Sequence, residues 1–353
     1  LRIEQKFYKR LQFEGNPATI VSKESTYSMS EQYNRAQSSS CYRTMIGGQA
    51  IIEGILMRGP QIQATVVRKP DGELEVKQEE LTLIKDRYPI LGVPIIRGSV
   101  NFLDSMVKGV GALMWSANFY PEEETGREPS KLDHWLEEKL GGEKAGQAAA
   151  AIAVFLGLAF SIGLFFMLPT FLTSFLDPFF PSQVLRNLIT GMVRIAVFLG
   201  YLIFCSRLKD IKRVFAYHGA EHKAIFCYER GLALTVENVR IQPKHHPRCG
   251  TSFLFVVIVL SILVFSVAFS YYQPPNILIR MLCQLALLPL VVGIGYEINR
   301  YVGRHDTLFT RLLTAPGLWL QNFTTNEPDD AMMEVSIAAL KMVLPAEKGK
   351  DAW

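Results

Sequence analysis

The segment "YHGAEH", residues 217 to 222, contains the side chains best suited to do chemistry in this chain. His218 and His222 are four positions apart, so on a helix both imidazoles lie on one face, one turn from each other. Two imidazoles at this spacing can hold one metal ion, and a glutamate beside them can orient or deprotonate a bound water. The sequence therefore predicts a site for Zn²⁺ or a similar divalent metal, with His218 and His222 as ligands and Glu221 as the catalytic base.

The His-x-x-Glu-His order reverses that of the zinc-peptidase motif and is informative without being decisive. A pattern with three fixed positions also arises by chance in long proteins. The alternative is a structural helix whose buried histidines bond to backbone carbonyls or to acidic side chains. A buried imidazole nitrogen that finds no such partner costs about 1 to 3 kcal/mol. Both interpretations stay open on the motif alone.

Two places in the chain offer a third ligand. The segment "KHHPRCGTSF" presents His246 and Cys249, and "GIGYEINRY" presents Glu297 near the end of an apolar run. Closure by His246 and Cys249 would give a four-coordinate, structural zinc site, whereas Glu297 would leave a position open for water. We favour Glu297, because a closed site has little use for the base Glu221. The alternative role of Glu297 is an ion pair at the membrane boundary with one of three arginines: Arg194, Arg248 or Arg300.

Four long apolar segments predict an α-helical integral membrane protein of about four transmembrane helices, with a small N-terminal α+β portion that contains a β-hairpin. The chain has 353 residues, of which 49% are hydrophobic, and the excess is concentrated in blocks. Residues 148 to 172 contain no charge across 25 positions, and a helix needs about 20 apolar residues to cross the hydrocarbon core. The other predicted spans are 187 to 206, 252 to 270 and 276 to 301.

The distribution of Lys and Arg predicts the orientation. The loop from 207 to 251 contains nine of these residues, the connection from 173 to 186 contains only Arg186, and that from 271 to 275 contains none. Basic loops favour the cytoplasmic side. The N-terminal region, the basic loop and the C-terminal tail are therefore expected in the cytoplasm, or in the stroma of a plastid. The net charge of +4 gives no argument for nucleic acid, so the expected partners are the lipid bilayer and other membrane proteins.

The regions outside the spans divide by composition and periodicity. Pro70-Asp71-Gly72 stands between two alternating segments and predicts a β-hairpin. Residues 1 to 44 are polar and predict a disordered extension or the remnant of a targeting segment. The predicted organisation is 1–44 extension, 45–90 β-hairpin portion, 91–120 amphipathic helix on the membrane surface, 121–147 charged connector with a short helix at 130–140, 148–301 four-span domain with the loop 207–251, and 302–353 C-terminal soluble helix and tail. A fifth, tilted membrane segment is the alternative for residues 93 to 117.

Five longer motifs resemble one protein family. They read, in chain order, "GGQAIIEGILMRGP", "YPILGVPIIRGSVNFLDSM", "YHGAEHKAIFCYE", "HPRCGTSFLF" and "TTNEPDDAMMEVSIAAL". Together they resemble the YqhQ-like family, a domain of unknown function found in bacteria and in plastid-bearing organisms, over about residues 45 to 343. The resemblance implies a multi-pass membrane protein labelled a predicted metal-dependent enzyme. Carried over by motif, it implies five candidate site positions: His218, Glu221, His222, His246 and Cys249.

Two function classes are consistent with these features. The first is a membrane-embedded metal-dependent hydrolase, a peptidase or a lipid-cleaving enzyme, with its site facing the cytoplasm or the stroma. The second is a non-enzymatic membrane scaffold or assembly factor, in which the histidines only organise that face. The expected location is a plasma membrane for a bacterial protein and a plastid membrane for a eukaryotic one.

Overall fold

The computed structural model describes residues 42–81, 88–120, 142–176, 179–180, 182–347 and 349–352. The predicted extension up to residue 41 and most of the predicted connector, including its short helix, lie outside these residues. Residues 42 to 44, which the sequence assigns to the extension, are instead tied to the folded part. The backbone N–H of Thr44 donates to the carboxylate of Glu229 at 3.0 Å, and Thr44 pairs with Ala352 in an isolated β-bridge.

The N-terminal portion is a four-stranded antiparallel sheet in the order β1-β2-β3-β4. Its strands are β1 (Gly47–Ile51), β2 (Gly54–Arg58), β3 (Ile62–Arg68) and β4 (Leu74–Glu80). The predicted hairpin joins β3 to β4, and its turn is closed by Gly72, whose φ is +89°. The prediction of a small N-terminal β portion is confirmed, and the sheet is larger than one hairpin because β1 and β2 form a second one.

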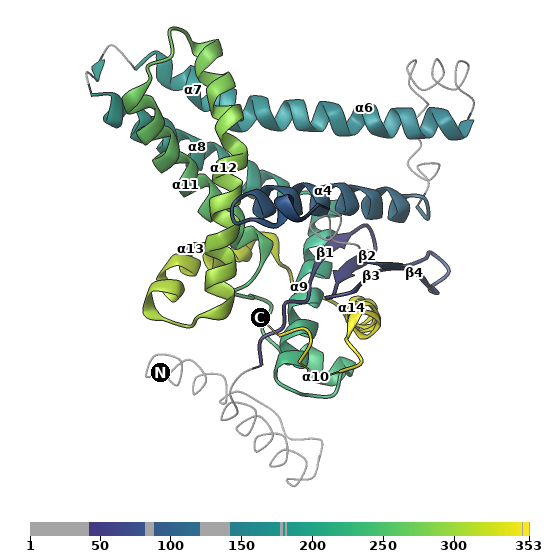
Figure 1. Cartoon of the computed structure of the whole chain (residues 1–353). Coiled ribbons are helices and arrows are strands. Elements are labelled where there is room, and N and C mark those ends of the chain that lie inside the picture. The colour runs from purple at the N-terminus through teal and green to yellow at the C-terminus, as the bar shows by residue number, and fades with distance from the viewer. Residues whose placement is uncertain are drawn as a thin grey trace, which may run out of the picture. The chain divides into compact units, whose positions relative to one another are not determined.

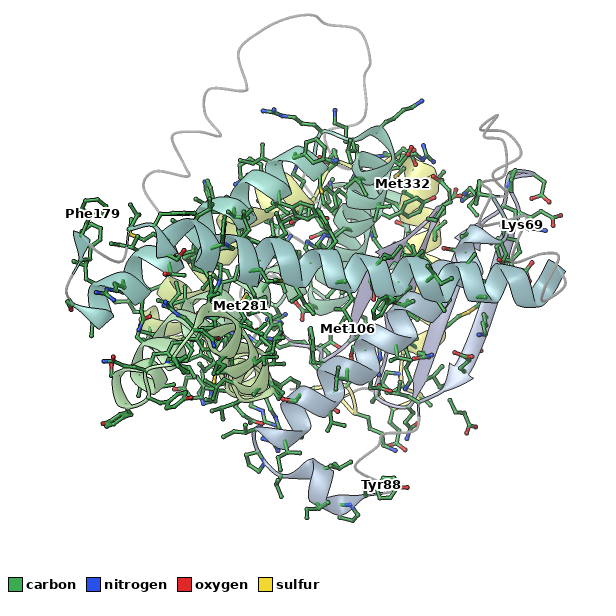
Figure 2. The ribbon with its side chains drawn as sticks, turned by 90° about the horizontal axis from the view of Figure 1, so that it is seen from above. Lys69, Tyr88, Met106, Phe179, Met281 and Met332 are labelled. Atoms are coloured by element: carbon green, nitrogen blue, oxygen red, sulfur yellow. The ribbon has the colours of Figure 1, made fainter. Side chains whose placement is uncertain are left out.

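Helices cover both faces of this sheet (Figure 1). Alternate residues of a strand point to opposite faces. Ile55 and Met57 of β2 pack with α9 (Lys209–Glu229) and α14 (Asp330–Val343) in the main hydrophobic core. Leu56, between them, packs with Ala112 of α4 (Ile96–Ala117) on the opposite face. In Figure 2, Met332 marks α14 and Met106 marks α4. The predicted amphipathic helix, α4, therefore packs against one face of the sheet.

Four helical segments are long and apolar enough to cross a membrane: Ala151–Ser174, Val184–Cys205, Gly250–Tyr271 and Ile277–Arg304. The first combines α6 (Gly142–Ile162), a π-helical turn (Gly163–Met167) and α7 (Leu168–Ser174). The others are α8 (Gln183–Cys205), α11 (Gly250–Tyr271) and α12 (Ile277–Arg304). These spans agree with the predicted ones within a few residues, so the chain is an α-helical integral membrane protein.

An even number of spans brings the N-terminal sheet, the loop after α8 and the C-terminal region to one side of the membrane. The packing of β2, α9 and α14 in one core agrees with this arrangement. The C-terminal region differs from the prediction of one soluble helix, because α13 (Leu308–Thr324) precedes α14. Helix α13 packs along α11. At this contact Gly317 lies so close to the backbone of Ser252 that a Cβ added to Gly317 would be 2.5 Å from the Cα of Ser252.

Which side of the membrane carries these regions is a prediction from the basic loop. We expect a cysteine at exposed Glu237, in the short helix α10 (Val236–Arg240), to react with an impermeant maleimide from the cytoplasmic side. A cysteine at exposed Gln273, between α11 and α12, should react only from the opposite side. Labelling both cysteines from the same side would contradict the four-span arrangement.

Candidate metal centre

The helix α9 carries three of the predicted site residues, and its ends are well defined. Its first turn contains Asp210, an acidic residue at the positive end of the helix dipole. It ends before Gly231, whose φ of +67° suits glycine. The N–H groups of Gly231 and Leu232 there donate to the carbonyls of Tyr228 and Cys227, which is a Schellman C-terminus. The helix packs against the sheet and α14, so Glu221 and His222 are 5% and 2% exposed.

Both histidines are oriented by backbone carbonyls. Nδ1 of His218 lies 2.8 Å from the carbonyl oxygen of Thr324, and Nδ1 of His222 lies 2.6 Å from that of Lys244. A carbonyl only accepts, so in the neutral imidazole the proton is on Nδ1 and the lone pair is on Nε2. The hydrogen bonds to backbone carbonyls that are expected for structural histidines are thus present, but each of them satisfies only one of the two nitrogens of its imidazole.

The remaining nitrogens converge on Cys249. Nε2 of His218 lies 3.1 Å from Sγ of Cys249, and the two imidazole centroids are 4.3 Å apart. Nε2 of His222 is buried and has no hydrogen-bond partner among the described residues. One ligand atom from each of His218, His222 and Cys249 lies within 4.8 Å of the other two. Metal-bound histidines commonly hold their second nitrogen on a carbonyl in this way.

Cys249 is the N-cap residue of α11, directly at the start of the third span. Its Sγ accepts from the hydroxyl of Thr251 at 3.3 Å. Burial by itself raises the pKa of this thiol, but the adjacent imidazolium forms of His218 and His222 lower it well below its usual value. Burial lowers the pKa of His218, but attraction to the Cys249 thiolate, the hydrogen bond to it, the charge of Glu221 and the Thr324 carbonyl together outweigh this and raise the pKa to about 9. The thiol is therefore held ready to act as a thiolate ligand or nucleophile.

Glu221 lies beside this group, with one oxygen fixed and one free. Oε1 accepts from the backbone N–H of Gly48 at 2.8 Å, whereas Oε2 is buried without a partner among the described residues. Gly48 is required here, because an added Cβ would lie 2.7 Å from the carbonyl oxygen of Leu56 and 3.0 Å from Cδ of Glu221. Burial raises the pKa of Glu221, although both histidines oppose this. A raised pKa makes this carboxylate a stronger base than an exposed glutamate.

The structure does not bring His246 into the group. Its Nδ1 accepts from the N–H of Arg248 at 3.3 Å, and its Nε2 lies 3.4 Å from the carboxylate of Glu229. Its backbone N–H and C=O are both bonded to the side-chain amide of Gln321. Burial lowers the pKa of His246 to about 4. This histidine orders the loop before α11, and of the pair His246 and Cys249 only the cysteine lies with His218 and His222.

Glu297, the third ligand favoured from the sequence, also lies elsewhere. Its carboxylate pairs with the guanidinium of Arg97 at the start of α4, with Nε donating at 2.7 Å, and not with any of the three arginines considered above. Gly98 and Gly293 touch at this crossing, where a Cβ on Gly98 would lie 2.9 Å from Cα of Gly293. The structure thus places Cys249, and not Glu297, beside His218 and His222, because Arg97 holds Glu297 at the junction of α4 and α12.

The donor set of two imidazoles and a thiolate suits Zn²⁺ and, among other ions, Cu and Co. Two buried atoms, Nε2 of His222 and Oε2 of Glu221, have no hydrogen-bond partner among the described residues, and a bound ion or polar group is one explanation for such atoms. Three protein ligands would leave a fourth position open, which is the arrangement of catalytic zinc rather than of structural zinc. Glu221 is close enough for its charge to interact with both imidazoles and with the thiol. The residues therefore fit a metal ion.

Gly219, between the two halves of the motif, lets the segment after α13 approach α9. A Cβ at this position would lie 2.1 Å from the carbonyl oxygen of Asn326, two residues after the Thr324 carbonyl that holds His218. We expect Gly219→Ala to destabilise the purified protein by about 1 to 3 kcal/mol through overpacking. Gly157→Ala on α6 is the matched control, because nothing lies within 4 Å of its added Cβ. Thermal unfolding in detergent measures both; equal melting temperatures would contradict the close approach.

The spans and this group together define a class: four-span integral membrane proteins with a largely buried His/Cys/Glu group next to the start of the third span. The family model described as "Protein of unknown function (DUF1385)" matches residues 93–346, and the chain belongs to this family. It is 34% identical over 311 residues to the "Uncharacterized protein YqhQ" of Bacillus subtilis (strain 168), covering 85% of this chain and 92% of the relative. No solved structure matches the chain.

Proposed function

We propose that the chain is a membrane-embedded metal-dependent hydrolase, with Zn²⁺ or a similar ion held by His218, His222 and Cys249 and with Glu221 as the base. The observation that carries this proposal is the convergence of two carbonyl-oriented histidines and one thiol beside a carboxylate with a free oxygen. A bound divalent metal supplies Lewis acidity, which brings the pKa of a water molecule into the neutral range.

Each residue of the group has a separate task in this proposal. The carbonyls of Thr324 and Lys244 hold the two imidazoles in the tautomer that presents Nε2. The N–H of Gly48 fixes one oxygen of Glu221, which leaves Oε2 to take a proton from water and pass it to the leaving group. Cys249 adds a negative charge to the ligand set and ties the site to the first turn of α11.

The position of the site restricts the substrate. Cys249 immediately precedes a membrane span, and α9 begins four residues after α8 ends. The scissile bond would therefore be reached at the membrane boundary, on the side carrying the basic loop. This favours a peptide segment of a membrane protein or a lipid ester as the substrate. The bacterial relative is consistent with a plasma-membrane location.

A second reading of the same atoms is a metal-free thiol hydrolase, with Cys249 as nucleophile and His218 as base. We favour the metal, because the thiol reading gives the second buried imidazole, His222, no role for its free Nε2. The scaffold alternative gives no role to either that nitrogen or Oε2 of Glu221.

One experiment separates the three readings. The full-length protein in detergent is offered fluorogenic peptides and fluorogenic lipid esters, first after chelation and then after addition of one equivalent of Zn²⁺. We expect hydrolysis only in the reconstituted sample. Hydrolysis that survives chelation and stops on thiol alkylation would establish the thiol reading instead. Tight metal binding without hydrolysis of any probe would favour the scaffold.

A further inference from the structure

The helix α13, which the sequence analysis did not predict, has a polar buried face. Residues that follow one another at alternating spacings of four and three lie on one stripe of a helix. On α13 such a stripe consists of Thr310, Thr314, Gly317, Gln321 and Thr324, and all of them are buried. The hydroxyl of Thr314 donates to the carbonyl of Thr310 at 3.0 Å, and the amide of Gln321 bonds to both backbone groups of His246. These groups are therefore satisfied without water.

The exposed face of α13 is apolar. A second stripe with the same spacing consists of Leu308, Leu312, Ala315 and Trp319, and all four residues are exposed. The exposed fraction of the side chain is 74% for Leu308, 65% for Leu312 and 52% for Trp319. A surface helix of a soluble domain has the reverse pattern, with its apolar stripe toward the core and polar residues toward water. The polarity of α13 is therefore inverted.

The face of α13 that packs on α11, beside it in Figure 1, has the composition of a helix contact inside a membrane. Such contacts are enriched in Gly, Ser and Thr, because small side chains let two helices approach closely. Gly317 and Ser252 meet in this way. The outward side chains of α13 are then large and apolar, as they are on the spans themselves.

The neighbours of α13 give its depth relative to the spans. It begins four residues after α12 ends, on the side of the membrane that carries the His/Cys group. Its middle residue of contact, Gly317, meets Ser252 in the first turn of α11. The uncharged run of α11 begins at this turn, directly after Arg248. The middle of α13 therefore lies at the level at which the hydrocarbon core of the bilayer begins.

We propose that α13 is an interfacial anchor, a helix that lies in the leaflet on the side of the His/Cys group with its exposed stripe among the acyl chains. Interfacial helices bury their apolar face about 5 to 10 Å into the boundary between headgroups and acyl chains, and tryptophan is enriched at this depth. The partner of the stripe is lipid and not a second protein. The anchor does not depend on the proposed hydrolase.

The last turns of α13 connect the anchor to the candidate metal centre. The carbonyl of Thr324 lies 2.8 Å from Nδ1 of His218, and Gln321 holds the backbone of His246. An anchored α13 therefore carries the supports of both histidines and keeps them at one depth relative to the bilayer surface.

The test measures the fluorescence of Trp319 in the full-length protein, reconstituted into phosphatidylcholine vesicles. The chain contains four tryptophans, so the Trp319 emission is the difference between the unaltered chain and Trp319→Phe. The lipids are brominated either near the headgroup end or near the tail end of the acyl chain, and iodide on both sides of the membrane serves as the aqueous quencher. We expect the Trp319 emission to be lost with bromine near the headgroup end, to be less affected by bromine near the tail end, and to resist iodide.

Ile241→Trp, made in the Trp319→Phe chain, is the matched control. Ile241 directly follows α10 and is 56% exposed, about as much as Trp319. Its tryptophan emission should be lost to iodide and should resist the brominated lipids.

Two outcomes would overturn the proposal. Loss of the Trp319 emission to iodide but not to brominated lipid would mean that the stripe faces water. Resistance of Trp319 to both quenchers would mean that a second copy of the chain or another protein covers the stripe in place of lipid.

Discussion

Replacing Glu221 with glutamine should lower metal-dependent hydrolysis by about 10²- to 10⁴-fold, the usual contribution of a positioned general base. Glutamine keeps the shape of the side chain, and its amide can still accept from the N–H of Gly48. It cannot take a proton from water at Oε2, however. The bound metal should remain, because Glu221 is not one of the three grouped ligands.

The measurement combines kcat/KM on the most rapidly cleaved probe with metal content per chain. Glu237→Gln, an exposed glutamate on α10, is the matched control and should leave both unchanged. Loss of metal in Glu221→Gln would make Glu221 a ligand. Unchanged hydrolysis in a metal-loaded variant would remove it from the proposed chemistry.

Replacing His218 and His222 together with alanine should reduce bound metal from about one ion per chain to almost none. The two imidazoles supply two of three grouped ligand atoms, and a lone thiolate cannot hold the ion against a chelator. Elemental analysis of the purified protein measures this loss, and circular dichroism establishes that the double variant remains helical. His305→Ala is the control, since His305 is exposed and its side chain bonds to the carbonyl of Tyr301, one turn earlier.

Glu297→Gln provides a second comparison. The carboxylate of Glu297 is paired with Arg97, so we expect the metal content to be unchanged and the melting temperature to fall as the junction of α4 and α12 loosens. Loss of metal in Glu297→Gln would return the site to the arrangement favoured from the sequence. Stoichiometric metal in the double histidine variant would place the metal at another part of the chain.

The membrane helices were predictable because each is encoded locally, as an uninterrupted apolar run of about the length that the bilayer requires. The helix α13 was not predicted. Its apolar residues are separated by threonines and by Pro316, and its 17 residues fall short of a span. Its exposed face carries Leu308, Phe309 and Trp319, a pattern that becomes interpretable only once α11 is seen beside it.

Only the residues of the candidate site that lie on one helix, α9, could be predicted from the sequence. The spacing of His218, Glu221 and His222 is a local property of α9. The choice of Cys249 over His246 is not local, because it depends on Glu229 and Gln321, which bond His246 and turn it away. The carbonyls of Thr324 and Lys244 leave no trace in the sequence, since any residue supplies a carbonyl.

The role of Glu297 could not be read from its neighbours for the same reason. Its partner, Arg97, is 200 positions away in the chain and approaches only because Gly98 and Gly293 allow α4 and α12 to touch. A carboxylate near a span end fits an ion pair and a metal ligand equally well until the crossing of these two helices is known.

The proposed ligand set is tested most directly by the spectrum of the Co²⁺-substituted protein. A thiolate ligand gives Co²⁺ an intense near-ultraviolet charge-transfer band, whereas imidazole and carboxylate ligands do not. We expect this band at one Co²⁺ per chain in the unaltered protein and in Glu297→Gln, and its loss in Cys249→Ser. Co²⁺ bound without the band, or a band that survives in Cys249→Ser, would contradict a centre built from His218, His222 and Cys249.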